Sequence, residues 1–338
     1  MLASLGQKSY RTKQLYTWLY RKRAESFDEM TDLPASLIEQ LKAEYCLMPL
    51  KEVKRQVAKD GTTKFLFEMQ DGASVEAVLM HFHFGDSLCV SSQIGCNMGC
   101  TFCASGLLKK ERNLTAGEMT AEVLYVQKEL DKTGGRVDNI VIMGTGEPFD
   151  NYDNVMDFCA TVNNDNGLAI GARHITISTC GIVPRIYDFA EGHYQYNLAV
   201  SLHAPNDELR RKLMPVDQAY PLDVLMKALK HYSEDNHRRL TFEYILLHDV
   251  NDTDAHAVQL ADLIRGMNAY VNLIPYNQVD ENGYHSTDDK KALHFYDVLM
   301  KHGVKATLRQ KHGDDIDAAC GQLRAKHEMK KQEKSEAE

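Results

Sequence analysis

Three cysteines lie within eight residues, at Cys96, Cys100 and Cys103 of the segment GCNMGCTFC. Three thiols this close together cannot share one face of a strand, so packing alone does not explain them. A structural zinc ion usually takes four protein ligands, commonly as paired C-x2-C units, and no second pair exists in this sequence. Three soft thiolates favour instead a [4Fe–4S] cluster with one open iron. An open iron can chelate a cofactor and pass it one electron, so the motif predicts radical chemistry on S-adenosylmethionine (SAM).

Three further residues could take part in chemistry, but each also has an ordinary explanation. Cys320 lies in a segment rich in small and acidic residues, which suits an accessible thiol, although cysteine is often buried. Cys89 lies on a predicted strand, where a core residue is the simpler interpretation. Alternation places Glu76 opposite Val75 and Ala77, so we expect it to face solvent; a general base is the alternative. We interpret the remaining cysteines as ordinary buried residues: Cys46, Cys159 and Cys180.

The segment Gly144-Thr145-Gly146-Glu147-Pro148 could bind a cofactor. It lacks the third glycine of the dinucleotide-binding fingerprint, which excludes that interpretation. Two others stay open. The segment is either a plain glycine turn at a strand end or a turn whose backbone and carboxylate hold the amino group of a cofactor.

A repeating α/β pattern supplies the elements that would position these residues. Short apolar, β-branched runs alternate with amphipathic helices from residue 88 onwards, which predicts a parallel sheet, open or curled into a partial barrel. The predicted strands are 88–93, 138–143, 174–179, 196–202, 240–246 and 270–275. The predicted helices are 115–131, 152–164, 182–191, 206–213, 221–235 and 254–266, followed by a helix at 287–302 and a strand near 305–309.

Two smaller segments precede this pattern and one follows it. Helical spacing over residues 8–45 predicts a small helical module, with a capping box at Ser26 and Glu29. The runs Thr63–Met69 and Ser74–Phe82, separated by Asp71-Gly72, are typical of a hairpin. We therefore expect a helical domain at 1–48, a hairpin extension at 49–87, the main domain at 88–325 and a disordered charged tail at 326–338.

Polar residues recur where the predicted strands end. In parallel α/β sheets the chemistry gathers at the carboxyl ends of the strands, and the cysteine motif itself follows the first strand. We therefore expect one pocket at one mouth of the sheet. Its strand-end groups would be the Gly144–Pro148 segment, Ser178, Cys180, Ser201, His203, Glu243 and Asn277.

Composition limits the classes of protein to consider. The chain has 338 residues, 43% of them hydrophobic, which is enough for one large domain and a small one. It has no apolar run of about 18 residues and no signal peptide, so we expect a cytoplasmic protein outside the membrane. Thiols stay reduced there, and the eight cysteines are expected as ligands, catalytic groups or core residues. Nothing in the sequence indicates an oligomer, and we expect a monomer.

The charge distribution leaves nucleic acid open as a partner. A net charge of −9 argues against it for the chain as a whole. Residues 1–23 nevertheless contain no acidic residue. Such a run is usually a solvated helix face, and the alternative is a phosphate-binding surface. Its basic residues are Lys8, Arg11, Lys13, Arg21, Lys22 and Arg23.

The cysteine motif resembles that of the radical SAM superfamily, and a larger pattern resembles one family within it. The segments SSQIGCNMGCTFCAS, MGTGEPFDNY, ARHITISTCGI, SLHAPNDELRRKLMP, VNLIPYN and GDDIDAACGQL are similar to the RlmN/Cfr family of RNA methyltransferases over about residues 8–325. Pro148 and Pro275 resemble the RlmN branch more than the Cfr branch. The resemblance implies a partial (βα)6 radical SAM barrel with a small N-terminal helical accessory domain and a β-hairpin extension. The chain starts later than is usual for the family, so we expect the first accessory helix to be incomplete.

The resemblance also assigns roles. It implies that Cys320 carries the methyl group, that Cys89 resolves the resulting adduct and that Glu76 accepts a proton, which reverses the simpler interpretation of all three. Cys96, Cys100 and Cys103 match the ligands of one [4Fe–4S] cluster. The positions that match contacts to SAM are Gly146, Glu147, Ser178, Ser201, Leu202, His203 and Asn277.

The activity implied by the resemblance is methylation of C2 of an adenine in 23S rRNA and of an adenine in tRNA. Two SAM molecules would be used, with a methyl-cysteine intermediate and a Cys89–Cys320 disulfide at the end. A flavodoxin-type electron donor and a thiol reductant are the other implied partners. Methylation of C8 of the same rRNA adenine is the alternative, and a non-catalytic iron–sulfur or zinc protein that binds RNA is the alternative from a different class. Candidates for contacts to the RNA backbone are Arg11, Lys13, Arg21, Lys22, Lys109, Lys110, Arg112, Arg210, Arg211 and Arg309.

Overall fold

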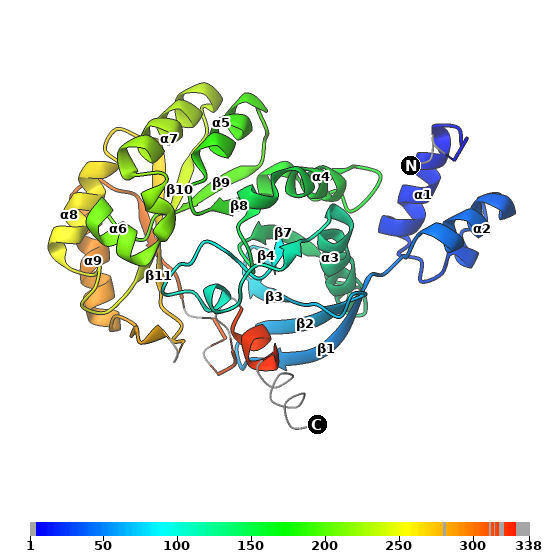
Figure 1. Cartoon of the computed structure of the whole chain (residues 1–338), viewed down its shortest axis with the longest axis horizontal. Coiled ribbons are helices and arrows are strands. Elements are labelled where there is room, and N and C mark those ends of the chain that lie inside the picture. The colour runs from blue at the N-terminus through cyan, green and yellow to red at the C-terminus, as the bar shows by residue number, and fades with distance from the viewer. Residues whose placement is uncertain (1–4, 280–281, 311, 314, 318–320, 329–338) are drawn as a thin grey trace.

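The computed structural model describes residues 5–279, 282–310, 312–313, 315–317 and 321–328. One ten-stranded sheet runs through the main body in the order β1-β2-β3-β4-β7-β8-β9-β10-β11-β12. Figure 1 shows this sheet curving through the molecule, with the larger helices along its outer side. Pairing is linear, because β1 and β12 are its two edges in the described part of the chain.

The first four strands are antiparallel: β1 (Leu50–Val57), β2 (Thr63–Met69), β3 (Ser74–Phe82) and β4 (Gly85–Val90). The predicted hairpin of β2 and β3 is confirmed. It is part of the main sheet, because β3 also pairs with β4. Strand β1 was not predicted, since only one of its side chains is buried and its charged residues hide the alternation. The strand expected at 88–93 begins at residue 85 instead, where it leaves β3 through a tight turn.

Within the ten-stranded sheet, every strand from β4 onwards pairs in parallel with its next neighbour, which confirms the predicted parallel sheet. The strands are β7 (Val137–Ile142), β8 (Ile175–Thr179), β9 (Asn197–Ser201), β10 (Leu240–Leu246), β11 (Ala269–Pro275) and β12 (Ala306–Leu308). The carboxyl ends of these parallel strands therefore all lie at the same end of the sheet, where the strands terminate.

The predicted helices cover the outer side of this sheet. They are α3 (Ala116–Asp131), α4 (Tyr152–Asn163), α5 (Val183–Glu191), α6 (Asp207–Leu213), α7 (Leu222–Asn236), α8 (Asp254–Leu263) and α9 (Asp289–Lys301). Apolar faces of α3, α4, α5, α7, α8 and α9 share one core with the strands. Helix α6 instead contributes Leu213 to a second apolar cluster with Phe102, Ala204, Leu247 and Tyr276.

The N-terminal module has a core of its own. It contains α1 (Tyr10–Tyr16), a π-helical turn at Thr17–Arg21 and α2 (Ala35–Glu44), and the predicted capping box of Ser26 and Glu29 is present. Figure 1 shows the module at one end of the molecule, on the side of α3 and α4. Two ion pairs join the module to α3 in the described part of the chain, between Arg23 and Asp131 at 2.8 Å and between Glu25 and Lys128 at 3.5 Å.

The end of the chain differs from the expected disordered tail. Residues 322–328 are helical, so the helix extends three residues into the segment 326–338. Lys326 is held there by an ion pair of 2.5 Å to Asp317. Residues 329–338 lie outside the described part of the chain. Within that part, no helix is both long and apolar enough to cross a membrane.

Candidate active site

A cavity of about 310 Å³ lies at the carboxyl ends of the parallel strands. All three clustered cysteines line it, together with most of the strand-end groups that the sequence singled out. The predicted residues in its wall are Cys96, Cys100, Cys103, Gly146, Glu147, Ser178, Ser201, His203 and Asn277. The expectation of one pocket at one mouth of the sheet is therefore confirmed.

The cysteine loop follows β4 and is held from three directions. The small sheet of β5 (Gln93–Ile94) and β6 (Arg112–Asn113) fixes its two ends. Thr101 N donates to Leu213 O at 2.9 Å, and the Tyr276 hydroxyl donates to Phe102 O at 3.2 Å. These contacts bring Met98, Cys100 and Cys103 against the second apolar cluster. The loop is thus positioned by α6 and β11, both far from it in the sequence.

The electrostatics of the three thiols fit a positively charged metal group. Burial raises the pKa of Cys96 to about 12, with further contributions from Cys103 and Glu147. Burial and then the neighbouring Cys103 and Cys96 raise the pKa of Cys100 well above its usual value. Three thiolates at these positions therefore need a counter-charge between them. An iron–sulfur cluster bound by the thiols supplies such a charge.

The turn at residues 144–148 is packed so tightly that its glycines are required. A Cβ atom on Gly144 would lie 2.7 Å from Val90 O, and one on Gly146, whose φ is +108°, would lie 2.6 Å from Gln93 Cβ. The Glu147 carboxylate is also buried, which raises its pKa. It accepts hydrogen bonds from Phe149 N, the Thr179 hydroxyl and Cys180 N at 2.7–3.0 Å. This carboxylate joins the ends of β7 and β8 as well as lining the cavity.

His203 enters the cavity wall as a neutral ring. It has a positive φ of +57° after β9, and its Nδ1 accepts a hydrogen bond from Ile245 N at 3.0 Å. Since a backbone N–H can only donate, the proton of the neutral ring lies on Nε2. Burial, and then the charge of Arg210, lower the pKa of His203 to about 3. His203 thus offers one hydrogen-bond donor over the whole ordinary pH range.

The neighbouring strand ends add hydroxyl groups. The Oγ atoms of Ser178 and Ser201 lie 3.5 Å apart. Leu202, a predicted SAM contact, is fully buried and its side chain is not part of the cavity wall. Its N–H donates instead to Glu243 O at 3.0 Å, so Leu202 belongs to the backbone support of the site.

Sequence reasoning assigned no chemical role to several residues of the cavity. Glu243 was expected there only as a strand-end residue, and Arg309 was assigned to the RNA backbone; both line the cavity. Cys180 was expected at a strand end and as an ordinary buried residue, and it is buried and also lines the cavity. Cys46 is exposed rather than buried, because it follows α2 in the connection to β1. Cys159 is buried, as expected.

Glu76 does not face solvent, so that expectation is wrong. Its strand lies between β2 and β4, and the C-terminal segment covers it, so the side chain is only 3% exposed. The carboxylate accepts hydrogen bonds from Gly321 N at 2.7 Å and Arg324 N at 2.5 Å. Lys64 Nζ lies 3.0 Å from its Oε2 in a buried ion pair. Alternation failed here because both faces of β3 are covered.

Gly321 connects this carboxylate to the cysteine loop. A Cβ atom on Gly321, whose φ is +81°, would lie 2.6 Å from the Oγ and 2.8 Å from the backbone N of Ser105. Ser105 lines the cavity two residues after Cys103. Cys320 precedes Gly321 in the sequence but lies outside the described residues. Its described neighbour therefore touches both Glu76 and the cysteine loop.

Cys89 lies on the same side of the molecule as Glu76. It is buried on β4 and pairs with Val78, two residues after Glu76 on β3. Ser91, directly after the end of β4, donates its hydroxyl to Glu76 O at 2.7 Å. The two strands that carry Cys89 and Glu76 are therefore neighbours in the sheet.

Several basic residues proposed for RNA contacts are occupied by the protein itself. Arg210 is fully buried, with Nη1 3.1 Å from Asp217 and Nη2 donating to Cys180 O at 2.7 Å. Arg112 forms ion pairs with Asp71 and Glu118. These two arginines are structural.

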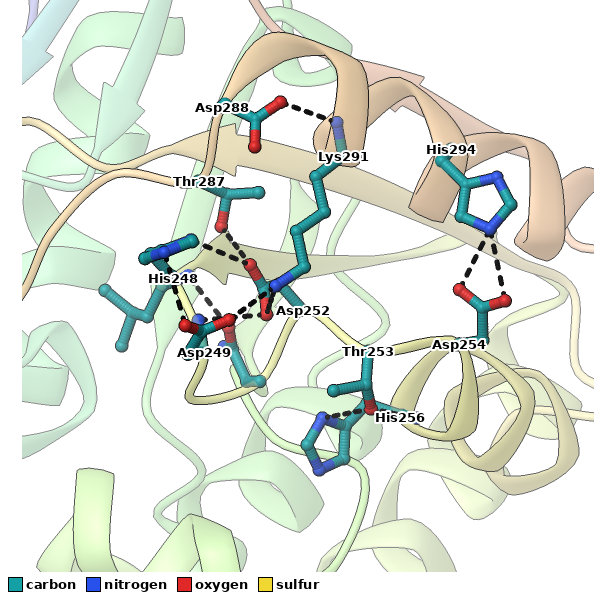
Figure 2. Close-up of polar contacts among 12 residues, drawn as sticks. His248, Asp249, Asp252, Thr253, Asp254, His256, Thr287, Asp288, Lys291 and His294 are labelled. Atoms are coloured by element: carbon teal, nitrogen blue, oxygen red, sulfur yellow. Dashed lines mark hydrogen bonds and ion pairs between the residues drawn. The ribbon is translucent and has the colours of Figure 1, made fainter.

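A second group of potential metal ligands lies away from the cavity. His248, Asp249 and Asp252 have ligand atoms within 4.8 Å of one another. Figure 2 shows the Lys291 ammonium between the two carboxylates, 2.8 Å from Asp249 and 2.9 Å from Asp252. The Thr287 hydroxyl also donates to Asp252 at 2.8 Å. A lysine already balances these charges, and the group fastens α9 to the loop after β10.

Comparisons with known proteins agree with this geometry. The sequence model of the radical SAM superfamily matches residues 90–261, and that of the "Ribosomal RNA large subunit methyltransferase N-terminal domain" matches residues 1–47. A probable dual-specificity RNA methyltransferase RlmN of Streptococcus thermophilus is 52% identical over 98% of this chain and 87% of its own length. One of Streptococcus pyogenes is 53% identical over 97% of this chain and 93% of its own.

A solved structure matches equally well. The crystal structure of a radical SAM methyltransferase from Sphaerobacter thermophilus has a TM-score of 0.91 at 44% identity, covering 96% of this chain and 95% of that one. The fold is therefore the radical SAM α/β fold, with a mixed sheet rather than an isolated barrel. With identity above one half across nearly the whole length, the chain belongs to the RlmN family of the radical SAM superfamily.

Proposed function

We propose that this protein is a SAM-dependent RNA methyltransferase that methylates C2 of an adenine in 23S rRNA and of an adenine in tRNA. The observation that carries the proposal is the position of Gly321, next to Cys320 in the sequence. It contacts Glu76 and packs against Ser105 of the cysteine loop. Three segments far apart in the sequence thus meet where the chemistry needs them. The relatives named as dual-specificity RNA methyltransferases support RNA as the substrate.

The cavity provides residues for both cofactors. Cys96, Cys100 and Cys103 would hold the [4Fe–4S] cluster, and the glycine turn with Glu147, Ser178, Ser201, His203 and Asn277 would surround SAM. When bound, these groups would supply one electron and a carbon radical. The protein would position them and exclude competing reactions.

Cys320 would act first, as a nucleophile. Its thiolate would attack the methyl carbon of one SAM, so that a new S–CH₃ bond forms on Cys320 as the S–CH₃ bond of SAM breaks. With a second SAM bound, one hydrogen atom of this methyl group would pass to the carbon radical derived from that SAM, and the methylene carbon would bond to C2 of the adenine. The adduct would then return one electron to the cluster held by Cys96, Cys100 and Cys103.

Glu76 and Cys89 would complete the reaction. Among described residues, Glu76 Oε1 accepts a single hydrogen bond, from Arg324 N, so this oxygen retains a lone pair that could take the C2 proton. The Cys89 thiolate would then attack the Cys320 sulfur. The S–S bond forms, the S–C bond breaks and the released carbon takes a proton to become the methyl group. A thiol reductant would reduce the disulfide, and a flavodoxin-type donor would supply electrons.

The RNA would have to present an unstacked adenine. An enzyme that acts on a base edge must take the base out of its stack, which costs about a few kcal/mol and least in looped RNA. Proteins read RNA sequence mainly in such loops. We assign residues 1–48 to RNA binding, residues 49–87 and 88–325 to the catalytic body, and the whole to a cytoplasmic monomer.

The test is anaerobic reconstitution with iron, sulfide, SAM and unmodified 23S rRNA or tRNA, followed by mass spectrometry of the nucleosides. We expect 2-methyladenosine. Formation of 8-methyladenosine would show the C8 reaction instead. A cluster-loaded protein that binds RNA and yields neither nucleoside would be a non-catalytic RNA-binding protein.

The matched variant is Cys320→Ala. We expect it to retain the iron content of the parent protein and to lose methyl transfer completely, because the carrier sulfur is gone. Full activity of this variant would exclude Cys320 as the methyl carrier while leaving the cofactor site intact.

A further inference from the structure

Lys64, in the antiparallel part of the sheet, is a fully buried lysine. It lies on β2, and its side chain is 0% exposed. Lysine is almost never buried to this degree unless it is paired, because its ammonium group loses hydration. A buried ion pair is also weak evidence for stability, since a well-packed apolar side chain of similar volume often serves as well. The position of Lys64 therefore needs a reason other than stability.

The ammonium group of Lys64 joins two segments that are far apart in the sequence. Its Nζ lies 3.0 Å from Oε2 of Glu76 on β3 and donates a hydrogen bond to the backbone O of Asp317 at 2.6 Å. Lys64 pairs with Val78, two residues after Glu76, so the side chains of Lys64 and Glu76 lie on the same face of neighbouring strands. Asp317 belongs to the C-terminal segment, 253 residues away. One charge thus connects the β2–β3 hairpin to the end of the chain.

The Glu76 carboxylate also holds the chain on the other side of Cys320. Gly321 N donates to Glu76 Oε2 at 2.7 Å. In the sequence, Asp317 lies three residues before Cys320, and Gly321 follows it directly. The nearest described residues on the two sides of Cys320 are therefore both fastened to Glu76, one through Lys64 and one directly.

The two oxygens of Glu76 have different surroundings. Oε2 meets the Lys64 ammonium and the Gly321 N–H, whereas Oε1 accepts one hydrogen bond among the described residues, from Arg324 N. Arg324 is itself held, because its guanidinium forms an ion pair of 2.6 Å with Glu111, directly before β6. By occupying Oε2, Lys64 helps to determine which oxygen of Glu76 stays able to accept a proton.

We propose that Lys64 is a positioning residue for the proposed reaction, which fixes the Glu76 carboxylate relative to the chain on both sides of Cys320. The inference rests on the proposed function, in which the carbon carried by Cys320 bonds to C2 of the adenine and Glu76 removes the proton from the same C2. The carbon donor and the base must then stay at a fixed separation, and Lys64 supplies that link. Without Lys64 the carboxylate turns more freely about its side-chain bonds, which slows proton removal. Methylation of Cys320 by SAM needs no base at Glu76 and continues.

The test isolates proton removal. Cluster-loaded wild-type protein and Lys64→Met first methylate Cys320 with SAM, and then react once, with dithionite as reductant, with RNA whose target adenine carries hydrogen or deuterium at C2. Lys64→Met should methylate Cys320 at the wild-type rate, as read from the mass of the intact protein. It should release methylated RNA about 10- to 100-fold more slowly, as for a misplaced catalytic group. Deuterium should slow this release more in the variant than in the wild type, because proton removal has become rate-limiting, whereas partial unfolding would lower the amount of active protein without changing the isotope effect.

Lys326→Met is the control variant. Lys326 forms an ion pair with the side chain of the same Asp317 and is 48% exposed. Its loss should leave the rate of release and the isotope effect at the wild-type values. If Lys64→Met does not fold, as judged by circular dichroism, Lys64→Gln takes its place, since its shorter amide donates hydrogen bonds but has no charge.

The inference is overturned while the proposed function stands if the Lys64 variant releases RNA at the wild-type rate, or slowly with the wild-type isotope effect. A Lys64 variant that cannot methylate Cys320 also overturns it, because Lys64 would then act in the earlier step. An equal effect of Lys326→Met would show that any anchor of Asp317 acts alike, which overturns the specific role of Lys64. If the wild-type protein forms no methylated nucleoside, the proposed function fails, and the inference fails with it.

Discussion

Glu76 and Glu243 are both buried glutamates on strands of one sheet, and their surroundings are opposite. Glu76 lies in the antiparallel part, where Lys64 and the backbone of Gly321 and Arg324 occupy both of its oxygens. Glu243 lies in the parallel part, where Asn272 occupies one oxygen and the other meets the cavity. The chain itself satisfies the first carboxylate, whereas one oxygen of the second has no hydrogen-bond partner among the described residues. Antiparallel strands covered by a chain segment thus hold a carboxylate in place through the chain itself, and the parallel strand ends leave a cavity.

The largest effect is expected at Cys89, on the antiparallel side. Under the proposed function, Cys89→Ala should stop turnover after one event, because no thiolate would break the proposed bond between Cys320 and the RNA. A covalent protein–RNA adduct should then accumulate, visible as a band on a denaturing gel that ribonuclease removes. Release of methylated RNA at the wild-type rate would show that another group resolves the adduct. The role proposed for Cys89 on the antiparallel side of the sheet would then be wrong.

Glu76→Gln should lower the free energy of unfolding by about 3 kcal/mol, because it breaks a buried ion pair. Lys64 Nζ keeps its hydrogen bond to Asp317 O at 2.6 Å but loses the carboxylate charge of Glu76. Lys64 and Glu76 are 0% and 3% exposed, so water cannot replace the lost partner. The double variant with Lys64→Met should recover part of the loss. Denaturant unfolding of the two variants measures this coupling, and additive losses would mean that the two residues do not interact.

His203 should make the cavity side sensitive to acid. Its folded-state pKa of about 3 is below the ordinary 6.5, so the unfolded chain binds the proton first and stability falls as pH falls from about 6.5 to about 3. The slope from this residue is about 1 kcal/mol per pH unit. His203→Asn, whose side-chain oxygen can accept from Ile245 N–H, should show a correspondingly shallower decline in urea unfolding between pH 6 and pH 4. An unchanged slope would mean that the ring is protonated in the folded state.

The smallest effect on stability is expected for Glu243→Gln without ligand. Removing the charge of a buried carboxylate that has one oxygen without a partner among the described residues should change the free energy of unfolding by less than about 1 kcal/mol, and in the stabilising direction. Thermal unfolding of Glu243→Gln and Glu76→Gln under the same conditions compares the two losses of stability directly. A loss as large as that of Glu76→Gln would show that the protein, not a ligand, satisfies Glu243.

Much of the architecture could be predicted because it follows from local pattern. The strand and helix periods of the parallel part, the hairpin at Asp71-Gly72 and the capping box at Ser26 were all visible in the sequence. Strand β1 was not, because an edge strand exposes charged side chains and has no apolar alternation. Glu76 was misplaced for the opposite reason, since a segment more than two hundred residues away covers the face that alternation assigned to solvent.

By itself, the sequence determined the chemistry that is available: three clustered thiols, a glycine turn and a polar residue at nearly every strand end. These depend on residue type and short spacing, which local patterns report. Only the tertiary structure decided that Arg210 is buried while Arg309 lines the cavity. It also decided that one oxygen of Glu243 lacks a hydrogen-bond partner in the described part of the chain and that Gly321 contacts Glu76. Burial and pairing depend on contacts between distant segments, and no local pattern contains them.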